Sequence, residues 1–255
     1  MLNWFRPQPA LPRRVRLSEK SWPGIVYAIG DVHGCLDQLL ELEALIARDC
    51  QEHGLPALTV TLGDYVDRGP ASAGVLDHLV LTRPSVGTRV CLAGNHEIMM
   101  LDFLSSPRHD HMWLANGGTE TLQSYGLDVK TLFQGGKRRT VERLASVIPV
   151  EHLEFLAGLP VSLALPGYVL VHAGMVPGRA LEEQLEDDML WMRIPAGPFP
   201  QEPYGTIVHG HTPGPRVVVE EGRVCVDTSA FASGILTAMR ISGPGEYSFM
   251  QTGRA

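Results

Sequence analysis

Short apolar runs alternate with longer amphipathic segments in the first part of the chain. Residues 24–29 and 58–62 are runs of β-branched and other apolar residues, which indicate buried strands. Residues 36–53 place leucine and isoleucine on one helical face, and a second helix is predicted over residues 71–81. A third buried strand is predicted over residues 89–93. Strand, glycine-containing loop and helix thus recur at a spacing of roughly 30 residues, which is typical of βαβ units.

The second half of the chain has a different pattern. Residues 98–159 are helical and irregular by composition, and an acidic helix is expected over residues 181–190. Residues 155–178 contain no charged side chain, but their prolines and glycines exclude a spanning helix and favour two buried strands joined by a turn. Further strands follow, including a hairpin around Glu221-Gly222. We therefore predict an α/β fold in which two packed mixed β-sheets form a β-sandwich flanked by helices.

Composition and charge narrow the functional classes. The net charge of −7 argues against nucleic acid as the main partner, because binding to a phosphate backbone needs a basic surface. The four cysteines show no CxxC spacing, which favours reduced thiols in a cytoplasmic protein. Residues 1–20 are rich in arginine and proline without the apolar core of a signal peptide. We expect a loosely ordered basic arm there, followed by a single domain over residues 21–255.

Candidate chemistry is concentrated in polar, glycine-containing loops that follow five predicted strands. Taken singly, such residues have ordinary explanations, since an Asp after a strand is commonly a helix N-cap and a lone His commonly packs in the core. Five such loops at strand ends are improbable by coincidence, and the carboxyl ends of parallel strands meet at one edge of a sheet. The loops carry Asp31, His33, Asp64, Asp67, Arg68, Asn95, His96, His172, His209 and His211.

The donor types in these loops predict a centre for two divalent cations. Carboxylate, imidazole and amide ligands without thiolate suit Mn²⁺, Fe or Zn²⁺. Asp31, His33 and Asp64 can hold one ion, while Asp64, Asn95 and two histidines can hold a second. Asp64 would then bridge ions about 3.5–4 Å apart, the spacing of two-metal hydrolases, which attack phosphorus directly with a bridging water.

Charged residues near the expected ions indicate phosphoryl chemistry. Arg68 and Arg193 are suited to bind the oxygens of a phosphoryl group. His96 follows a candidate ligand and, paired with Asp67, is a natural general acid for an alkoxide leaving group.

The loops also resemble the signature blocks of a known family. The segments 30–34, 63–69, 94–97, 172–174 and 210–212 are similar to those of the PPP-type serine/threonine phosphatases of the calcineurin-like metallophosphoesterase superfamily, especially the bacterial and bacteriophage-lambda-like members. The resemblance implies a helix-flanked β-sandwich and two divalent cations, Mn²⁺ foremost. It implies that the metal ligands are Asp31, His33, Asp64, Asn95, His172 and His211, that Asp67 and His96 form an acid pair, and that Arg68, Arg193 and Asn95 bind phosphate.

From these observations we expect a dinuclear-metal phosphomonoesterase that removes phosphate from phosphoserine or phosphothreonine in proteins. Its substrate would be a phosphoprotein or phosphopeptide, with neither nucleic acid nor membrane as a partner and with a monomer as the default state. The alternative enzyme is a symmetrical dinucleoside tetraphosphate hydrolase, which shares the fold, the metals and most blocks, although residues 65–68 look more like those of the protein phosphatases. A non-catalytic metal-binding scaffold is disfavoured because no expected ligand is missing.

Overall fold

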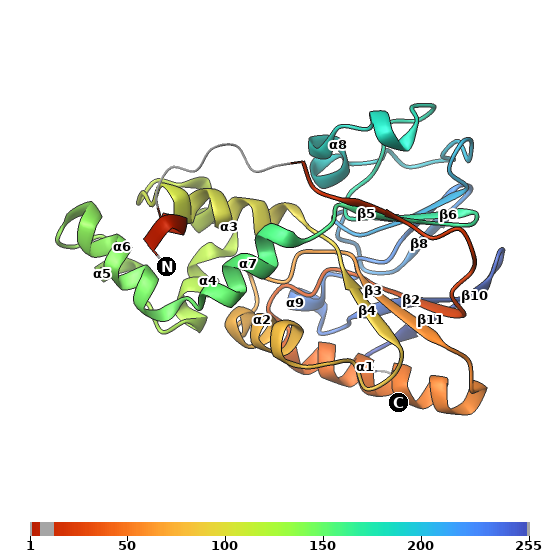
Figure 1. The fold of residues 1–255 in the computed structure, drawn as a ribbon, viewed down its shortest axis with the longest axis horizontal. Helices are drawn as coiled ribbons and strands as arrows, with labels where there is room; N and C mark the ends of the chain where they lie inside the picture. The colour runs from red at the N-terminus through yellow and green to blue at the C-terminus, as the bar shows by residue number, and fades with distance from the viewer. Residues whose placement is uncertain (1, 6–12, 254–255) are drawn as a thin grey trace.

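Two β-sheets packed face to face form the centre of the molecule (Figure 1). The computed structural model describes residues 2–5 and 13–253. The strands are β1 Arg16–Ser18, β2 Ile25–Ile29, β3 Ala57–Thr61, β4 Thr88–Cys91, β5 Ser162–Leu165, β6 Tyr168–Val171, β7 Thr206–His209, β8 Val218–Glu220, β9 Arg223–Cys225, β10 Thr237–Gly243 and β11 Glu246–Gln251. They form a six-stranded sheet of order β1-β5-β6-β7-β9-β8 and a five-stranded sheet of order β11-β10-β2-β3-β4. Both sheets mix parallel and antiparallel pairs, which confirms the predicted α/β sandwich.

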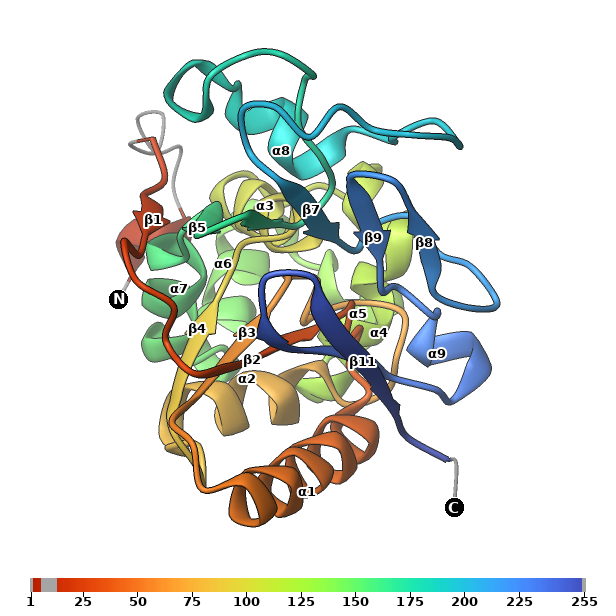
Figure 2. The same ribbon diagram turned by 90° about the vertical axis from the view of Figure 1, so that its right-hand side faces the viewer.

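Helices cover the outer faces and one end of this sandwich. They are α1 Leu36–His53, α2 Ser72–Leu81, α3 Asn95–Ser105, α4 Thr119–Ser124, α5 Val129–Leu132, α6 Gly136–Val147, α7 Val150–Gly158, α8 Glu186–Trp191 and α9 Ala230–Ser233. Figure 2 shows α1 and α2 below the five-stranded sheet and α8 beyond the six-stranded sheet. The helices α3 to α7 gather at one end of the molecule (Figure 1), so the middle of the chain is helical as predicted.

Strand β2 shows why its apolar run is continuous. Val26 and Ala28 face the six-stranded sheet and pack in the apolar layer between the two sheets. Ile25, Tyr27 and Ile29 point to the opposite face and pack in the larger core beneath the helices. All five residues are fully buried, because a strand covered on both faces has no solvent side on which polar residues could alternate.

Parallel pairing brings the loops together. Strands β2, β3 and β4 are parallel neighbours in one sheet, and β6, β7 and β9 are parallel neighbours in the other. The loops that follow these strands therefore leave from the carboxyl-terminal edges of the two sheets. This arrangement is the one that the recurring strand and loop pattern predicts.

The N-terminal segment departs from the predicted arm. Residues 16–18 form β1, which pairs in parallel with β5 at the edge of the six-stranded sheet. Arg14 is buried, and its Nη1 donates hydrogen bonds of 2.9 Å to the carbonyl oxygens of Leu156 and Leu159 at the end of α7. Those carbonyls have no partner within the helix, so the arginine satisfies them. The boundary predicted at residue 20 does not separate this strand from the sheet, and residues 6–12 of the predicted arm lie outside the described residues.

Two further segments differ from the sequence expectation. The acidic segment forms a 3₁₀ turn over Leu181–Glu183 and then α8, because the backbone is extended at Gln184 and Leu185. The Gln184 side chain donates hydrogen bonds to the carbonyl oxygens of Val176 and Arg179. Residues 155–178, which carry no charged side chain, begin within helix α7, and the two expected strands, β5 and β6, follow it. Within the described residues, no helix has the length and apolarity that crossing a membrane requires.

Candidate metal centre

The candidate residues lie in loops whose backbone is strained. Six non-glycine residues in the described chain have a positive φ, and five of them are candidate site residues, namely His33, Asp64, Asp67, Arg68 and His211, with φ between 44° and 76°. The left-handed region costs a residue with a side chain roughly 1 kcal/mol or more, so this strain persists only where the surroundings hold it. Such strain collects at functional sites, and here it marks three of the predicted loops.

Asp64 lies at the centre of two sets of converging ligand atoms. One set comprises His33, Asp64 and His96, and the other comprises Asp64, His172 and His211. Within each set, all ligand atoms lie within 4.8 Å of one another. Asp64 Oδ2 is 3.4 Å from His33 Nε2, and Asp64 Oδ1 is 3.5 Å from His172 Nε2. The shared carboxylate is thus placed where a bridging ligand would have to be.

Hydrogen bonds fix the orientation of two of these histidines. His33 Nδ1 lies 2.9 Å from the carbonyl oxygen of Val66, and His172 Nδ1 lies 2.9 Å from that of Leu62. Each Nδ1 must therefore carry the proton, which leaves the Nε2 lone pair directed into the site. His33 Nε2 is buried without a hydrogen-bond partner, and His172 Nε2 faces Asn95 Oδ1 at 2.9 Å. Acceptor atoms that face one another in this way fit a cation between them.

The electrostatics of the buried groups also fit cations. Burial raises the pKa of Asp64 to about 7, and burial together with the carboxylate of Asp227 raises the pKa of Asp31. Burial lowers the pKa of His211 to about 4 and that of His172 well below its ordinary value, so these imidazoles are neutral. Neutral imidazoles around uncompensated carboxylates form a donor set that divalent cations satisfy. The residues present therefore fit a two-metal centre.

Asp31 lies beside these two sets and not within either. Its two carboxylate oxygens accept the backbone N–H of His211 at 3.2 and 3.1 Å. A side chain at Gly210 would obstruct this contact, because a Cβ there would lie 1.9 Å from Asp31 Oδ1. The structure thus does not bring Asp31 into a set with His33 and Asp64, and its role as a ligand stays a prediction. His209, also buried, bonds its own loop through Nδ1 and the carbonyl oxygen of Gly210.

The predicted acid pair is in direct contact. His96 Nδ1 lies 2.6 Å from Asp67 Oδ2, and His96 Nε2 accepts a hydrogen bond of 3.1 Å from Arg68 Nη2. Asp67 also accepts hydrogen bonds from Trp113 Nε1 at 2.8 Å and from Thr121 Oγ1 at 2.7 Å. Besides His96, two side-chain donors therefore hold this carboxylate and, through it, the ring of His96.

The two arginines differ in exposure and in their neighbours. Arg68 is half-buried, and its guanidinium lies 5.0 Å from the ring centre of Phe231. Arg193 is exposed in the loop after α8, where its positive charge adds to burial in lowering the pKa of His211. Arg68 thus contacts His96 and Phe231, while the charge of Arg193 acts on His211.

Glu97 supports the backbone of the candidate site, although no role was expected for it from the sequence. It is fully buried, and its carboxylate accepts the backbone N–H groups of Asp64 and Tyr65 at 2.8 Å and that of Gly94 at 2.9 Å. A signal was present in the sequence, since an acidic residue three positions after the N-cap, here Gly94, is the usual partner of a helix N-terminus. The carboxylate ties the loop after β3 to the start of α3.

We predict that Glu97→Gln destabilises the protein. The new amide NH₂ would face backbone N–H donors, and an unsatisfied buried donor costs about 1–3 kcal/mol. Thermal unfolding should therefore shift to lower temperature, with a parallel loss of Mn²⁺ affinity as the Asp64 loop loosens. Glu154→Gln, at an exposed position of α7, is the matched control and should change neither quantity. An unchanged melting temperature for Glu97→Gln would contradict the role given to this carboxylate.

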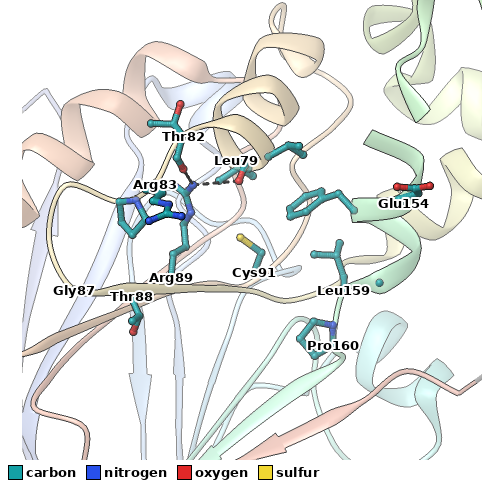
Figure 3. Close-up of a pocket in the computed structure, with 14 residues that line it drawn as sticks. Leu79, Thr82, Arg83, Gly87, Thr88, Arg89, Cys91, Glu154, Leu159 and Pro160 are labelled. Atoms are coloured by element: carbon teal, nitrogen blue, oxygen red, sulfur yellow. Dashed lines mark hydrogen bonds between the residues drawn. The ribbon is translucent and has the colours of Figure 1, made fainter. Parts of the chain in front are cut away.

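A separate groove of about 700 Å³ runs along the free edge of β4 (Figure 3). The ends of α2 and α7 form its walls, and Arg89 donates hydrogen bonds to the carbonyl oxygens of Leu79 and Thr82 there. Arg89 also pairs with Glu43 at 2.8 Å, so its charge is already compensated. None of the residues lining this groove is a predicted site residue, so the groove is distinct from the metal centre.

Comparison with known proteins agrees with this centre. The family model of the calcineurin-like phosphoesterases matches residues 25–231, which include every predicted site residue. A crystal structure provisionally assigned as a diadenosine tetraphosphatase superposes with a TM-score of 0.62 over 93% of this chain and 98% of the other, at 22% identity. At that identity the likeness extends to the fold alone.

Two curated relatives have different activities. Serine/threonine-protein phosphatase 1 of Salmonella typhimurium is 40% identical over 103 residues, which is 40% of this chain. The symmetrical bis(5'-nucleosyl)-tetraphosphatase of Methylobacillus flagellatus is 28% identical over 218 residues, which is 86% of this chain. The matches span 43% and 66% of the lengths of these two relatives.

Proposed function

We propose that this chain, which belongs to the calcineurin-like phosphoesterase family, hydrolyses symmetrical dinucleoside tetraphosphates. The observation that carries the hydrolytic site is the position of Asp64, which is shared by two sets of converging ligand atoms. The substrate class is supported by the tetraphosphatase relative, whose match extends over 86% of the chain. This support favours the alternative considered from the sequence over protein dephosphorylation, the main expectation.

Asp64 is proposed as the bridging ligand, with His33 on one ion and Asn95, His172 and His211 on the other. Asp31 is proposed as a further ligand. Divalent cations bound there, with Mn²⁺ as the proposed metal, supply positive charge against phosphoryl oxygens and lower the pKa of the water they bind. The protein contributes ligands whose orientation is fixed in advance by the carbonyl oxygens of Val66 and Leu62.

Arg68 and Arg193 are proposed to bind phosphoryl oxygens, with Asn95 as a further contact. In the cleavage, a water oxygen forms a bond to an inner phosphorus, the central P–O–P bond breaks, and two nucleoside diphosphates leave. In the structure, Arg68 Nη2 donates a hydrogen bond to His96 Nε2, so this nitrogen is already engaged. A bound phosphate would draw the guanidinium away, because a charged acceptor makes the stronger hydrogen bond. Nε2 would then be free to carry a proton.

Phosphoserine and phosphothreonine proteins are a second candidate substrate class. The observation that favours them is the contact of 2.6 Å between Asp67 and His96. An alkoxide leaving group needs a proton in the transition state, and a carboxylate-oriented histidine is suited to give it. The central anhydride releases a nucleoside diphosphate, which leaves readily as an anion and needs this acid less.

The test is phosphate-ester and anhydride hydrolysis by metal-stripped protein supplied with Mn²⁺. Diadenosine tetraphosphate and a phosphoseryl peptide are assayed side by side, with Asp64→Asn as the inactive reference. We expect the nucleotide to turn over at least tenfold faster in kcat/KM, about 1.4 kcal/mol of preference. The reverse order would make the protein a serine/threonine phosphatase with the same centre. No turnover of either substrate by the Mn²⁺-loaded protein would favour the non-catalytic scaffold.

A further inference from the structure

A cavity of about 500 Å³ opens beside the proposed centre, and Arg68 forms part of its wall. Its other walls are the segment that links α3 to α4 and the ring of Phe231. The linking segment is held against the site, because Arg68 donates its backbone N–H to the carbonyl oxygen of Gly117 at 3.3 Å. A Cβ at Gly117 would lie 2.5 Å from that same nitrogen, so the close approach requires glycine. The cavity is therefore part of the architecture around the phosphate-binding arginine.

Phe231 gives this cavity an aromatic face next to the centre. The ring is 40% exposed, although an aromatic ring is ordinarily driven into the core. The ring forms a T-shaped pair with His33 at a centroid separation of 5.5 Å, and the Arg68 guanidinium lies over the ring at 5.0 Å from its centre. An exposed ring held in place by two site residues is a platform on which a planar group can stack.

Two polar side chains that line the cavity, those of Asn116 and Glu120, offer hydrogen-bond acceptors. Asn116 Nδ2 donates to the carbonyl oxygen of Met112 at 2.8 Å, which directs Oδ1 away from that bond. Among the described residues, no hydrogen bond or ion pair engages Asn116 Oδ1 or the carboxylate of Glu120, which is partly exposed. Both residues line the cavity. A ligand that fills it should therefore present hydrogen-bond donors to them.

We infer that this cavity binds the nucleobase of a substrate whose phosphate lies on Arg68, and that it selects a purine carrying an amino group, such as adenine. This inference rests on the proposed function. The base would stack on Phe231 and donate its exocyclic amine to Glu120 and Asn116. The volume suits a nucleoside, since small-molecule sites commonly measure about 300–1,000 Å³. The phosphates that Arg68 contacts would then connect the bound nucleoside to the metal centre.

A basic residue of a phosphopeptide is the competing occupant, since lysine and arginine also donate hydrogen bonds to carboxylates. The cavity disfavours it, because the guanidinium of Arg68 lines the same space and would repel a second cation. A neutral base avoids this repulsion and uses the aromatic face as well.

The first experiment measures binding by isothermal titration calorimetry to the Mn²⁺-loaded protein. ADP and inorganic pyrophosphate are compared, because they share the diphosphate and differ in the nucleoside. Phe231→Leu should weaken ADP binding roughly tenfold or more, the loss expected for base stacking, while pyrophosphate affinity stays within about twofold. Phe249→Leu, an exposed phenylalanine in β11, is the matched control and should leave both affinities unchanged. Equal loss for both ligands in Phe231→Leu would show that the ring only supports Arg68 and would overturn the inference.

The second experiment exchanges the donor on the base. IDP carries a carbonyl at the position where ADP carries its amine, so the unaltered protein should bind ADP about tenfold more tightly than IDP. Glu120→Gln should remove most of this preference, because an amide can donate to the carbonyl. Equal affinity for ADP and IDP in the unaltered protein would overturn the selection of an amino purine.

These measurements separate the inference from the proposed function. If ADP binds through Phe231 but diadenosine tetraphosphate is not cleaved, the base site stands and the proposed reaction fails. If the tetraphosphate is cleaved and Phe231→Leu leaves ADP binding unchanged, the reaction stands and the base site fails. If Glu120→Gln weakens only a phosphoseryl peptide with an adjacent arginine, the cavity serves peptides and the inference is wrong.

Discussion

Asp64→Asn is expected to abolish hydrolysis and to remove the response to metal while leaving the protein folded. Asp64 is the one ligand common to both sets of converging atoms, so its loss affects both ions at once. Residues that act as a unit lose most of the rate together, and kcat should fall by roughly 10³-fold or more on every substrate. Hydrolysis rates and bound Mn²⁺, measured by elemental analysis of dialysed protein, should fall together.

The same substitution should not weaken the metal-free protein. Burial raises the pKa of Asp64 to about 7, so the ionised carboxylate is unfavourable in the folded state at pH 8 when no cation is present. Asparagine removes that penalty, which is on the order of a few kcal/mol. It also tolerates the positive φ at this position and can still accept the backbone N–H of His96.

Thermal unfolding at pH 8 provides the check. Without metal, Asp64→Asn should melt at the same temperature as the unaltered protein or higher. Mn²⁺ at 100 times its dissociation constant should stabilise the unaltered protein by about 2.7 kcal/mol and the variant by much less. An Asp64→Asn protein that still gains stability from Mn²⁺ would show that the ions are held without a bridging carboxylate.

The features of this protein that could be predicted from the sequence are those whose structure depends on residues close together in the chain. The helix predicted over residues 36–53 is α1, with the same bounds, because its apolar face repeats with the helical period and Gly54 ends it in the left-handed conformation. The loop residues Asp64 and Asn95 follow the parallel neighbours β3 and β4 and therefore leave the same edge of one sheet, while His172 follows β6 of the other sheet. Here local pattern and topology point to the same arrangement.

The parts that do not follow depend on contacts between distant segments. Trp113 and Thr121 donate to Asp67 across 46 and 54 residues, from a helical region whose pattern gives no register against the loop. Strand β1 forms only because β5 offers a free edge, and its own three residues carry no strand signal. Asp31 follows the same strand and loop pattern as Asp64, yet the backbone N–H of His211 draws its carboxylate aside. The spacing of such residues along the sequence predicts that they lie near the centre, but it does not predict which distant residues they bond.

His96→Asn is expected to impair substrates according to their leaving groups. A general acid contributes about 10²–10⁴-fold, and its value is greatest where an alkoxide must be protonated. Turnover of a phosphoseryl peptide should fall by about 10²-fold or more. Turnover of p-nitrophenyl phosphate and diadenosine tetraphosphate should fall by roughly tenfold or less, because their leaving groups are stable anions. Steady-state kcat values for the three substrates, measured with saturating Mn²⁺, give the comparison.

Metal content decides between two roles for His96. Its Nε2 lies 3.8 Å from Asp64 Oδ2, close enough for His96 to bind an ion together with His33. As a ligand, its loss would reduce bound Mn²⁺ and slow all three substrates alike. As an acid oriented by Asp67, its loss would leave Mn²⁺ in place. Trp113→Phe removes one of the donors that hold Asp67 and keeps an aromatic side chain, so it should reproduce the same leaving-group dependence at smaller amplitude. Agreement between the two variants would show that His96, oriented by Asp67, gives its proton to the leaving group, whereas a uniform loss in both would assign this histidine to the metal.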